Sequence, residues 1–485
     1  MSIKEKNSIL NIVRKFLWSR NYPLTLLAVA VICHVLGLDL VGYCVFVLGG
    51  IMVNLFLSDC RPLIPTLIIA GTCSSAINGF GRGQSSAFYS SPFVIGSLIA
   101  LGVLFVASCI AHVIIYKSYR GLWTKLSSSL TALGVAVICF SALIGGLFSV
   151  YYNFMSFIVA GTFAGLLAGV YLYLVMTMEK RDDNIDYVLF SVMLAGVGVA
   201  CQVLAFYALN YRGGELDSAW KGKLLMGAYI SNTAGELIAI SLPAYFLFAS
   251  KRTKGWIYIL CACALTGVIA LTLCRAALLF AAPLMLFGFL WCCFKGKNKK
   301  FSRIFTACCV VLGIGAIIAF LCMDGAEKIG GFFSDTGFAD RGRFTLWKQM
   351  LSLFTQFPVF GAGFSALYQI NNHAAGSVNL YSALAHNTVF QMIGSCGIVG
   401  VLALIFHRFT TVRMIVKNFT VDRFFVGITL LMFIAIALLD QTFFFPHFVI
   451  LYSVLLAVGE NDYVSVGEKK QEIKEEEKVK ATKQK

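Results

Sequence analysis

Apolar runs of about 18–24 residues recur along almost the whole chain and limit what it can fold into. A helix of that length crosses a hydrocarbon core of about 30 Å, and it satisfies its own backbone hydrogen bonds in lipid. Charged residues make up only 13% of the chain and hydrophobic residues 59%, which excludes a water-soluble fold. The sequence therefore predicts an all-α, polytopic transmembrane helical bundle of about 12–14 spans.

We predict fourteen spans within a single membrane domain over residues 1–458. A large extracytoplasmic loop over 323–382 interrupts the domain, and a charged cytoplasmic tail over 459–485 follows it. The predicted spans are 24–38, 40–57, 62–78, 93–116, 126–149, 154–178, 185–208, 224–249, 256–273, 275–294, 304–322, 383–406, 424–438 and 441–458.

Sidedness follows from the basic residues. If the N-terminus is cytoplasmic, the cytoplasmic segments hold 30 of the 39 Lys and Arg residues, as the positive-inside rule requires. Both termini are then cytoplasmic, and the 323–382 loop is extracytoplasmic. The net charge of +16 is spread over short loops between apolar runs, so it reflects topology and does not indicate a nucleic-acid partner.

The large loop contains a basic and aromatic stretch, RGRFTLWKQMLSLF. From Phe344 its apolar residues recur at three and four, which predicts an amphipathic helix at the membrane interface that ends before Pro358. The predicted stripe consists of Phe344, Trp347, Met350, Leu351 and Phe354.

Three arginines are candidates for binding an anion. Arg275 lies in the turn of a tight hairpin, where its planar guanidinium would suit a phosphate, or would simply reach the outer interface. Arg341 and Arg343 precede the amphipathic helix, where side chains and free N–H groups together can hold phosphate oxygens. Contact with lipid headgroups would produce the same pair.

His386 is the candidate general base, because an imidazole accepts a hydroxyl proton at neutral pH. It stands with Asn387 and Gln391 at the external end of an apolar span. The alternative is a histidine that is merely hydrogen-bonded. His373, in the large loop, is the reserve candidate.

Further polar residues lie in or beside spans. Asn232 and Glu236 are four residues apart on one face of a span, which indicates a functional site or an interhelical contact. Asp440 and Gln441, at the last external turn, could orient a base, although plain solvation is the commonest fate of such a pair.

The sequence lacks the motifs of several other classes of enzyme and transporter. The chain has no Walker loop, GxSxG or HExxH, which weakens interpretations as a pump, a serine hydrolase or a zinc protease. Its sixteen cysteines lie almost wholly in apolar runs and form no CxxC pair. The external loop has no acidic cluster, so we expect no metal and no other cofactor.

Four elements occur in a fixed order: TLCRA at a hairpin, RGRFTLWKQM, FPVFGAGF, and AHNTVFQMIGSCGIVG. This order resembles the O-antigen ligase and O-antigen polymerase superfamily of bacterial envelope proteins. The matching positions are Arg343 with Trp347, then Pro358, Gly361 and Gly363, then His386 with Asn387. Cys274 and Ala276 depart from the family's usual Ser and Gly around Arg275, so that element matches more loosely.

The resemblance implies a metal-independent, inverting glycosyltransferase of the GT-C type in the bacterial inner (cytoplasmic) membrane. It would transfer a glycan from an undecaprenyl-pyrophosphate-linked donor to an acceptor hydroxyl on a glycan or lipid-linked acceptor. Its catalytic residues would be His386, Arg343 and Arg275, and its substrate-binding residues Arg341, Trp347, Asn387, Asn232 and Glu236. The alternatives are a polymerase of lipid-linked repeat units and, from another class, a flippase or transporter for lipid-linked sugars.

Overall fold

The structure is a computed structural model that describes residues 3–73, 91–120, 122–211, 213, 224–226, 229–320, 343–372, 384–417 and 419–461. Every one of the fourteen predicted spans overlaps a helix. The first half of the chain forms α1 (Ile3–Trp18), α2 (Asn21–Leu36), α3 (Asp39–Phe56), α4 (Leu63–Cys73), α6 (Pro92–Ile115), α7 (Leu122–Ser127), α8 (Leu130–Leu143), α9 (Phe154–Thr177) and α10 (Asn184–Asn210).

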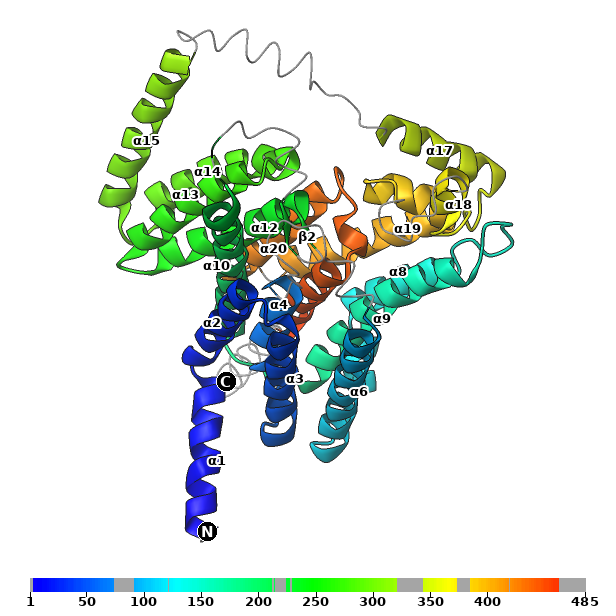
Figure 1. The fold of residues 1–485 in the computed structure, drawn as a ribbon, viewed down its shortest axis with the longest axis horizontal. Coiled ribbons are helices and arrows are strands. Elements are labelled where there is room, and N and C mark those ends of the chain that lie inside the picture. The colour runs from blue at the N-terminus through cyan, green and yellow to red at the C-terminus, as the bar shows by residue number, and fades with distance from the viewer. Residues whose placement is uncertain are drawn as a thin grey trace, which may run out of the picture.

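The second half begins with a minimal antiparallel hairpin of β1 (Leu225–Met226) and β2 (Tyr229–Ile230). Helices then follow to the end of the described chain (Figure 1). They are α12 (Ser231–Lys251), α13 (Gly255–Leu271), α14 (Arg275–Lys295), α15 (Lys299–Phe320), α17 (Arg343–Gln356), α18 (Ala366–Asn372), α19 (Thr388–Lys417), α20 (Val421–Ile436), the short 3-10 helix η3 (Thr442–Phe444) and a last helix over residues 446–461.

Six of these helices are long and apolar enough to cross a membrane alone: α6, α9, α10, α12, α14 and α19. A seventh candidate is the pair formed by the end of α1 and α2, which is bent by 76°. Three shorter apolar helices belong to α3, α8 and α13. The protein is therefore a polytopic all-α membrane protein, as predicted.

α12 is the central helix, and its whole apolar window is buried inside the bundle. It packs against α10, α13, α14 and α20. Small residues allow the close approach: Gly196 of α10 faces Ser241, and Gly288 of α14 faces the ring of Phe246. By contrast, α6 packs on α3 and leaves most of its apolar side chains exposed, as a helix in contact with lipid does.

α17 confirms the predicted helix after the basic stretch, and one of its faces packs on α19. Met350 and Leu353 are buried in a small core with the segment before α19. Phe344 and Leu351 point away and are about half exposed. The predicted stripe is thus divided between a face that holds the protein together and a face that is open to the surroundings.

α19 is broken at Gly397, whose φ of 63° and ψ of −154° are not helical. The turn over residues 358–363, which contains all of the FPVFGAG motif but its first residue, lies in the break and supplies partners for the backbone groups that the helix leaves unbonded there. Four bonds join the two segments: Ala362 N to Gly394 O (2.7 Å), Gly363 N to Ser395 O (3.0 Å), Ile398 N to Pro358 O (2.9 Å) and Val399 N to Val359 O (3.2 Å).

Replacing Gly397 by Ala should destabilise the protein by about 2–5 kcal/mol, because a left-handed backbone penalises a side chain and its Cβ would overlap the carbonyls of Pro358 and Val359. Gly165→Ala on α9 is the matched control, since a Cβ there meets nothing within 4 Å. Thermal unfolding in detergent should show a lower midpoint for Gly397→Ala alone. Equal midpoints for the two variants would contradict this account of the break.

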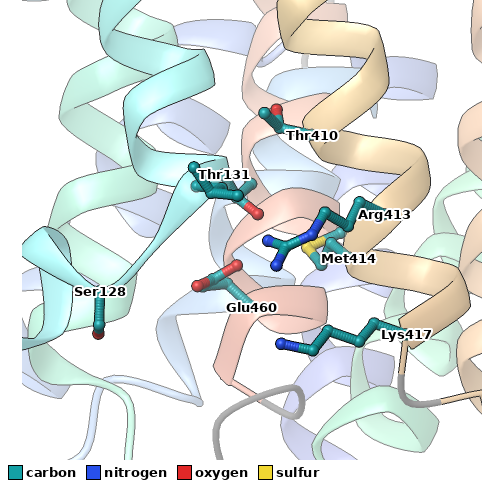
Figure 2. A pocket seen from close by; sticks show the side chains of 8 residues that line it. Ser128, Thr131, Thr410, Arg413, Met414, Lys417 and Glu460 are labelled. Atoms are coloured by element: carbon teal, nitrogen blue, oxygen red, sulfur yellow. The ribbon is translucent and has the colours of Figure 1, made fainter.

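At its other end, α19 is tied to α20 and to the last helix by Arg423, whose side chain is fully buried. Its Nη1 donates to Met414 O (3.2 Å) and its Nη2 to Gly459 O (2.8 Å). Figure 2 shows this region, where the end of α19 and the end of the last helix lie beside the start of α8. The hydrogen bonds of Arg423 therefore hold the end of α19, the start of α20 and the end of the last helix in a fixed arrangement.

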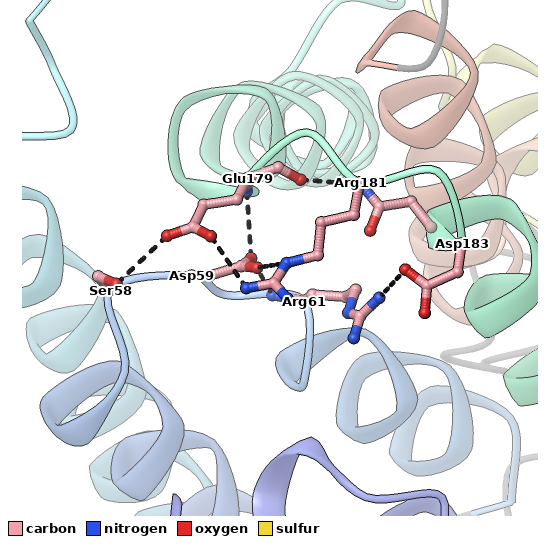
Figure 3. Close-up of polar contacts among 7 residues, drawn as sticks. Ser58, Asp59, Arg61, Glu179, Arg181 and Asp183 are labelled. Atoms are coloured by element: carbon pink, nitrogen blue, oxygen red, sulfur yellow. Dashed lines mark hydrogen bonds and ion pairs between the residues drawn. The ribbon is translucent and has the colours of Figure 1, made fainter. Parts of the chain in front are cut away.

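Charged residues from two distant turns form one cluster, shown in Figure 3. The Asp59 carboxylate, after α3, accepts from the backbone N–H of Arg61 (2.9 Å) and of Glu179 (3.2 Å). Arg181 Nε lies 3.3 Å from Asp59 Oδ2, and Arg61 Nη1 lies 2.6 Å from Asp183 Oδ1. The turns that follow α3 and α9 therefore lie together, in agreement with their prediction on one side of the membrane.

Candidate functional site

His386 lies directly before α19, and its ring meets a carboxylate from the far end of the sequence. Its Nδ1 is 2.9 Å from Oδ1 of Asp440, which follows α20. The histidine side chain is 26% exposed and that of Asp440 is 6% exposed. With the carboxylate ionised, Nδ1–H donates to Oδ1, and the Nε2 atom keeps a lone pair for accepting a proton.

Asp440 is held by four neighbours and is not solvated, so the expectation of plain solvation for this residue was wrong. Besides His386, its carboxylate accepts from the N–H of Gln441 (2.8 Å) and from Nδ2 of Asn232 (3.3 Å), and Nη2 of Arg343 is 4.0 Å away. Burial alone would raise the pKa of Asp440. His386, Gln441 and Arg343 outweigh burial and lower that pKa below its usual value, which keeps the carboxylate charged at neutral pH.

Arg343 begins α17, and its side chain is 33% exposed. A guanidinium that reaches the buried carboxylate of Asp440 on one side still presents other N–H donors to the outside. The backbone N–H groups of the first turn of α17 have no partners within the helix. The start of α17 is therefore able to receive phosphate oxygens next to His386.

Trp347 fixes the segment that carries His386. Its indole N–H donates to Ala385 O (2.9 Å), and its ring stacks on Phe390 with centroids 4.9 Å apart. Gln391 holds the same segment from α19, because its Oε1 accepts from Ala385 N (2.7 Å). Hydrogen bonds from Trp347 and Gln391 therefore fix both backbone groups of Ala385, the residue before the candidate base.

Asn387 caps α19 and joins it to the segment that bears Asp440. Its Oδ1 accepts from Val389 N (2.8 Å) and Phe390 N (3.1 Å), as an N-cap side chain does. Its Nδ2 donates to Leu438 O (2.7 Å). His386 itself has a φ of 49°, a left-handed conformation that this network of bonds maintains.

The structure places Arg275 as the first residue of α14, directly after the predicted tight turn from α13. Its side chain is exposed. The turn before it packs on Gly235 of α12, where an added Cβ would strike Thr272 and Cys274. Asn232, the partner of Asp440, is three residues earlier on α12, so the Arg275 turn and the Asp440 segment contact the same end of this helix.

Of the remaining predicted residues, the structure places only Glu236. Glu236 is fully buried on α12, one turn deeper in the bundle than Asn232. Arg341 and the reserve candidate His373 lie outside the described residues.

The cluster thus combines a carboxylate-supported imidazole with a nearby guanidinium, and most of its members fall in one stretch of sequence. Residues 259–405 match the family model described as O-antigen ligase, and we refer to this stretch as the O-antigen ligase domain. This family match confirms the resemblance drawn from the four sequence elements. The O-antigen ligase domain contains Arg275, Arg343, Trp347, His386 and Asn387. No curated protein matches the chain.

Asp440 and Asn232 lie outside the O-antigen ligase domain and still complete its polar cluster. Sequence analysis considered Asp440 but did not include it among the site residues. The signal was a carboxylate between two apolar segments, LLD and TFFF, because such a residue needs a partner inside a membrane protein.

Proposed function

We propose that the protein transfers a glycan from an undecaprenyl-pyrophosphate-linked donor to an acceptor hydroxyl on the extracytoplasmic side of the bacterial inner membrane. The observation that carries the proposal is the His386–Asp440 pair beside Arg343, within and next to an O-antigen ligase domain. An imidazole held by a charged carboxylate is a general base, and a neighbouring guanidinium receives developing negative charge.

In this reaction, Nε2 of His386 takes the proton of the acceptor hydroxyl. The acceptor oxygen attacks the anomeric carbon from the face opposite the pyrophosphate, so a new C–O bond forms as the bond to pyrophosphate breaks and the configuration inverts. Asp440 orients the ring and stabilises the imidazolium that results. The lipid pyrophosphate departs with the bonding electron pair.

Arg343 and Arg275 stabilise the charge on the departing pyrophosphate. Arg343 stands next to Asp440, and the exposed Arg275 extends from the turn that packs on α12. Positive side chains thereby supply the charge stabilisation that a divalent cation supplies in other glycosyltransferases.

We assign the substrate-binding residues different tasks. The polar groups of Trp347 and Asn387 are hydrogen-bonded to backbone carbonyls of the protein. These two residues therefore act as positioning residues for His386. Asn232 and Arg341 remain proposed contacts of the glycan or pyrophosphate, whereas the burial of Glu236 argues against a direct contact for that residue. The exposed apolar face of α17, with Phe344 and Leu351, is a surface for the prenyl chain.

The test is an assay with purified full-length protein, a prenyl-pyrophosphate-linked repeat unit and a separate acceptor, with products identified by mass spectrometry. We expect covalent transfer, with turnover unchanged when EDTA removes divalent cations. Transfer to the separate acceptor indicates a ligase, and lengthening of prenyl-linked glycans indicates a polymerase. Loss of turnover in EDTA that Mg²⁺ restores would refute metal independence. Passage of the donor across a liposome without new bonds would refute the enzyme in favour of a transporter.

A further inference from the structure

A cavity of about 240 Å³ lies at the end of α19 remote from His386. It opens between α8, α19 and the last helix (Figure 2). Pockets for drug-sized ligands measure roughly 300–1,000 Å³, so this one suits a small ionic group better than a glycan. Its lining consists of Ser128, Leu130, Thr131, Thr410, Arg413, Met414, Lys417 and Glu460.

Charges of both signs line the cavity. Arg413 and Lys417 come from the last turns of α19, and the side chain of Glu460 comes from the end of the last helix. Figure 2 shows the Arg413 guanidinium and the Glu460 carboxylate directed into the same space. Two cations and one anion therefore face a single cavity.

Glu460 is 4% exposed, yet within the described part of the chain its carboxylate forms no ion pair or hydrogen bond. In this part of the chain, Glu460 and Arg413 also form no ion pair with each other. A buried carboxylate is costly unless a cation or donor compensates it. A ligand that compensates both charges must place a positive group at Glu460 and a negative group at Arg413.

The start of α8 favours binding of the negative group of the ligand. α8 begins at Leu130, which lines the cavity together with Thr131, and the positive end of a helix dipole attracts an anion. The buried Arg423 fixes the ends of α19 and of the last helix relative to each other, so the walls are already in place. A phosphate therefore suits the side of the cavity formed by α8 and α19.

The surface beside the cavity is apolar. Val412, Val416 and Phe419 adjoin Arg413 and Lys417 in sequence, and their side chains are 58%, 62% and 59% exposed. On a membrane protein such exposed side chains meet acyl chains. A lipid would fit both features, with its headgroup in the cavity and its tails against this end of α19.

We propose that this cavity binds the headgroup of a phospholipid that carries both a phosphate and a primary ammonium, as phosphatidylethanolamine does. Arg413 and Lys417 bind the phosphate, and Glu460 accepts hydrogen bonds from the ammonium. A purely anionic headgroup would be repelled by Glu460. A quaternary ammonium has no N–H to donate to it.

The experiment is native mass spectrometry of the full-length protein with phosphatidylethanolamine, phosphatidylglycerol or phosphatidylcholine of identical acyl chains. We expect phosphatidylethanolamine to bind tightest. Arg413→Ala and the exposed Lys417→Ala should weaken its binding about tenfold, as loss of a charge-assisted hydrogen bond does. Glu460→Gln should remove the preference over phosphatidylglycerol. Arg303→Ala, an exposed basic residue on α15, is the matched control and should change nothing.

Competition with soluble O-phosphoethanolamine and inorganic phosphate separates a lipid from a free anion. A phosphatidylethanolamine adduct that millimolar concentrations of either solute leave intact supports the lipid. Equal binding of the three lipids, or displacement by inorganic phosphate alone, would overturn the proposal. So would unchanged binding in both Lys417→Ala and Glu460→Gln, since Lys417 is exposed and its replacement should leave the fold intact.

Discussion

His386→Ala should reduce glycan transfer by about 10³-fold or more, because the acceptor hydroxyl loses its proton acceptor. The variant should still insert and fold, with a lower unfolding temperature, since the buried carboxylate of Asp440 loses one of its four partners. Initial rates with purified donor and acceptor measure the effect. Near-normal turnover in a folded variant would remove His386 as the base.

Asp440→Asn tests whether the two residues act as one unit. An amide cannot stabilise the imidazolium and favours the wrong ring tautomer, so we expect a loss of about 10²-fold or more. The His386→Ala, Asp440→Asn double variant should be no slower than His386→Ala alone. Asp422→Asn is the matched control, because Asp422 pairs with Lys251 at the opposite end of α20. Additive losses in the double variant would assign Asp440 a separate role.

Arg343→Ala should reduce transfer by about 10²-fold or more, since a donor aimed at developing charge is then missing. Arg343→Lys should recover only part of the rate, because an ammonium lacks the planar, bidentate geometry of a guanidinium. The same pair of substitutions at Arg275 should follow the same order. The loss should appear in kcat more than in KM if the arginines act on the leaving group.

Lys348→Ala is the matched control for Arg343, because Lys348 is an exposed cation on the same helix. It should leave the rate unchanged. Full activity in Arg343→Lys, or an equal loss in Lys348→Ala, would show that α17 acts through diffuse positive charge and not through one guanidinium.

The helices were predictable because each apolar run is long enough to be recognised by itself. The α13–α14 turn at Arg275 and the helix after Arg343 were also predicted from local patterns, since a charge in a tight hairpin and a three-and-four repeat are features of neighbouring residues. Helix ends were less predictable. α19 extends to Lys417 and includes Arg408, which was assigned to a loop, because Tyr452 and the ring of Phe443 compensate its charge.

Long-range partners were predictable only in part: Asp440 was named as a residue that could orient a base, but its pairing with His386 was not predicted. His386 and Asp440 are separated by 54 residues, and nothing in either local sequence states that they pair. The glycines of the FPVFGAG motif were recognised only through a resemblance. Their physical reason, a turn that enters a broken helix, depends on the backbone of α19 and is visible only in three dimensions.

The position of Asp440 after α19 and α20 has a consequence for biosynthesis. A ribosome has already made α17, His386, and all of α19 and α20 before it reaches the codon for Asp440. The nascent chain therefore cannot complete the histidine–carboxylate pair until α20 has also entered the membrane. Unfinished chains, and products cut short before residue 440, therefore carry the O-antigen ligase domain without its carboxylate.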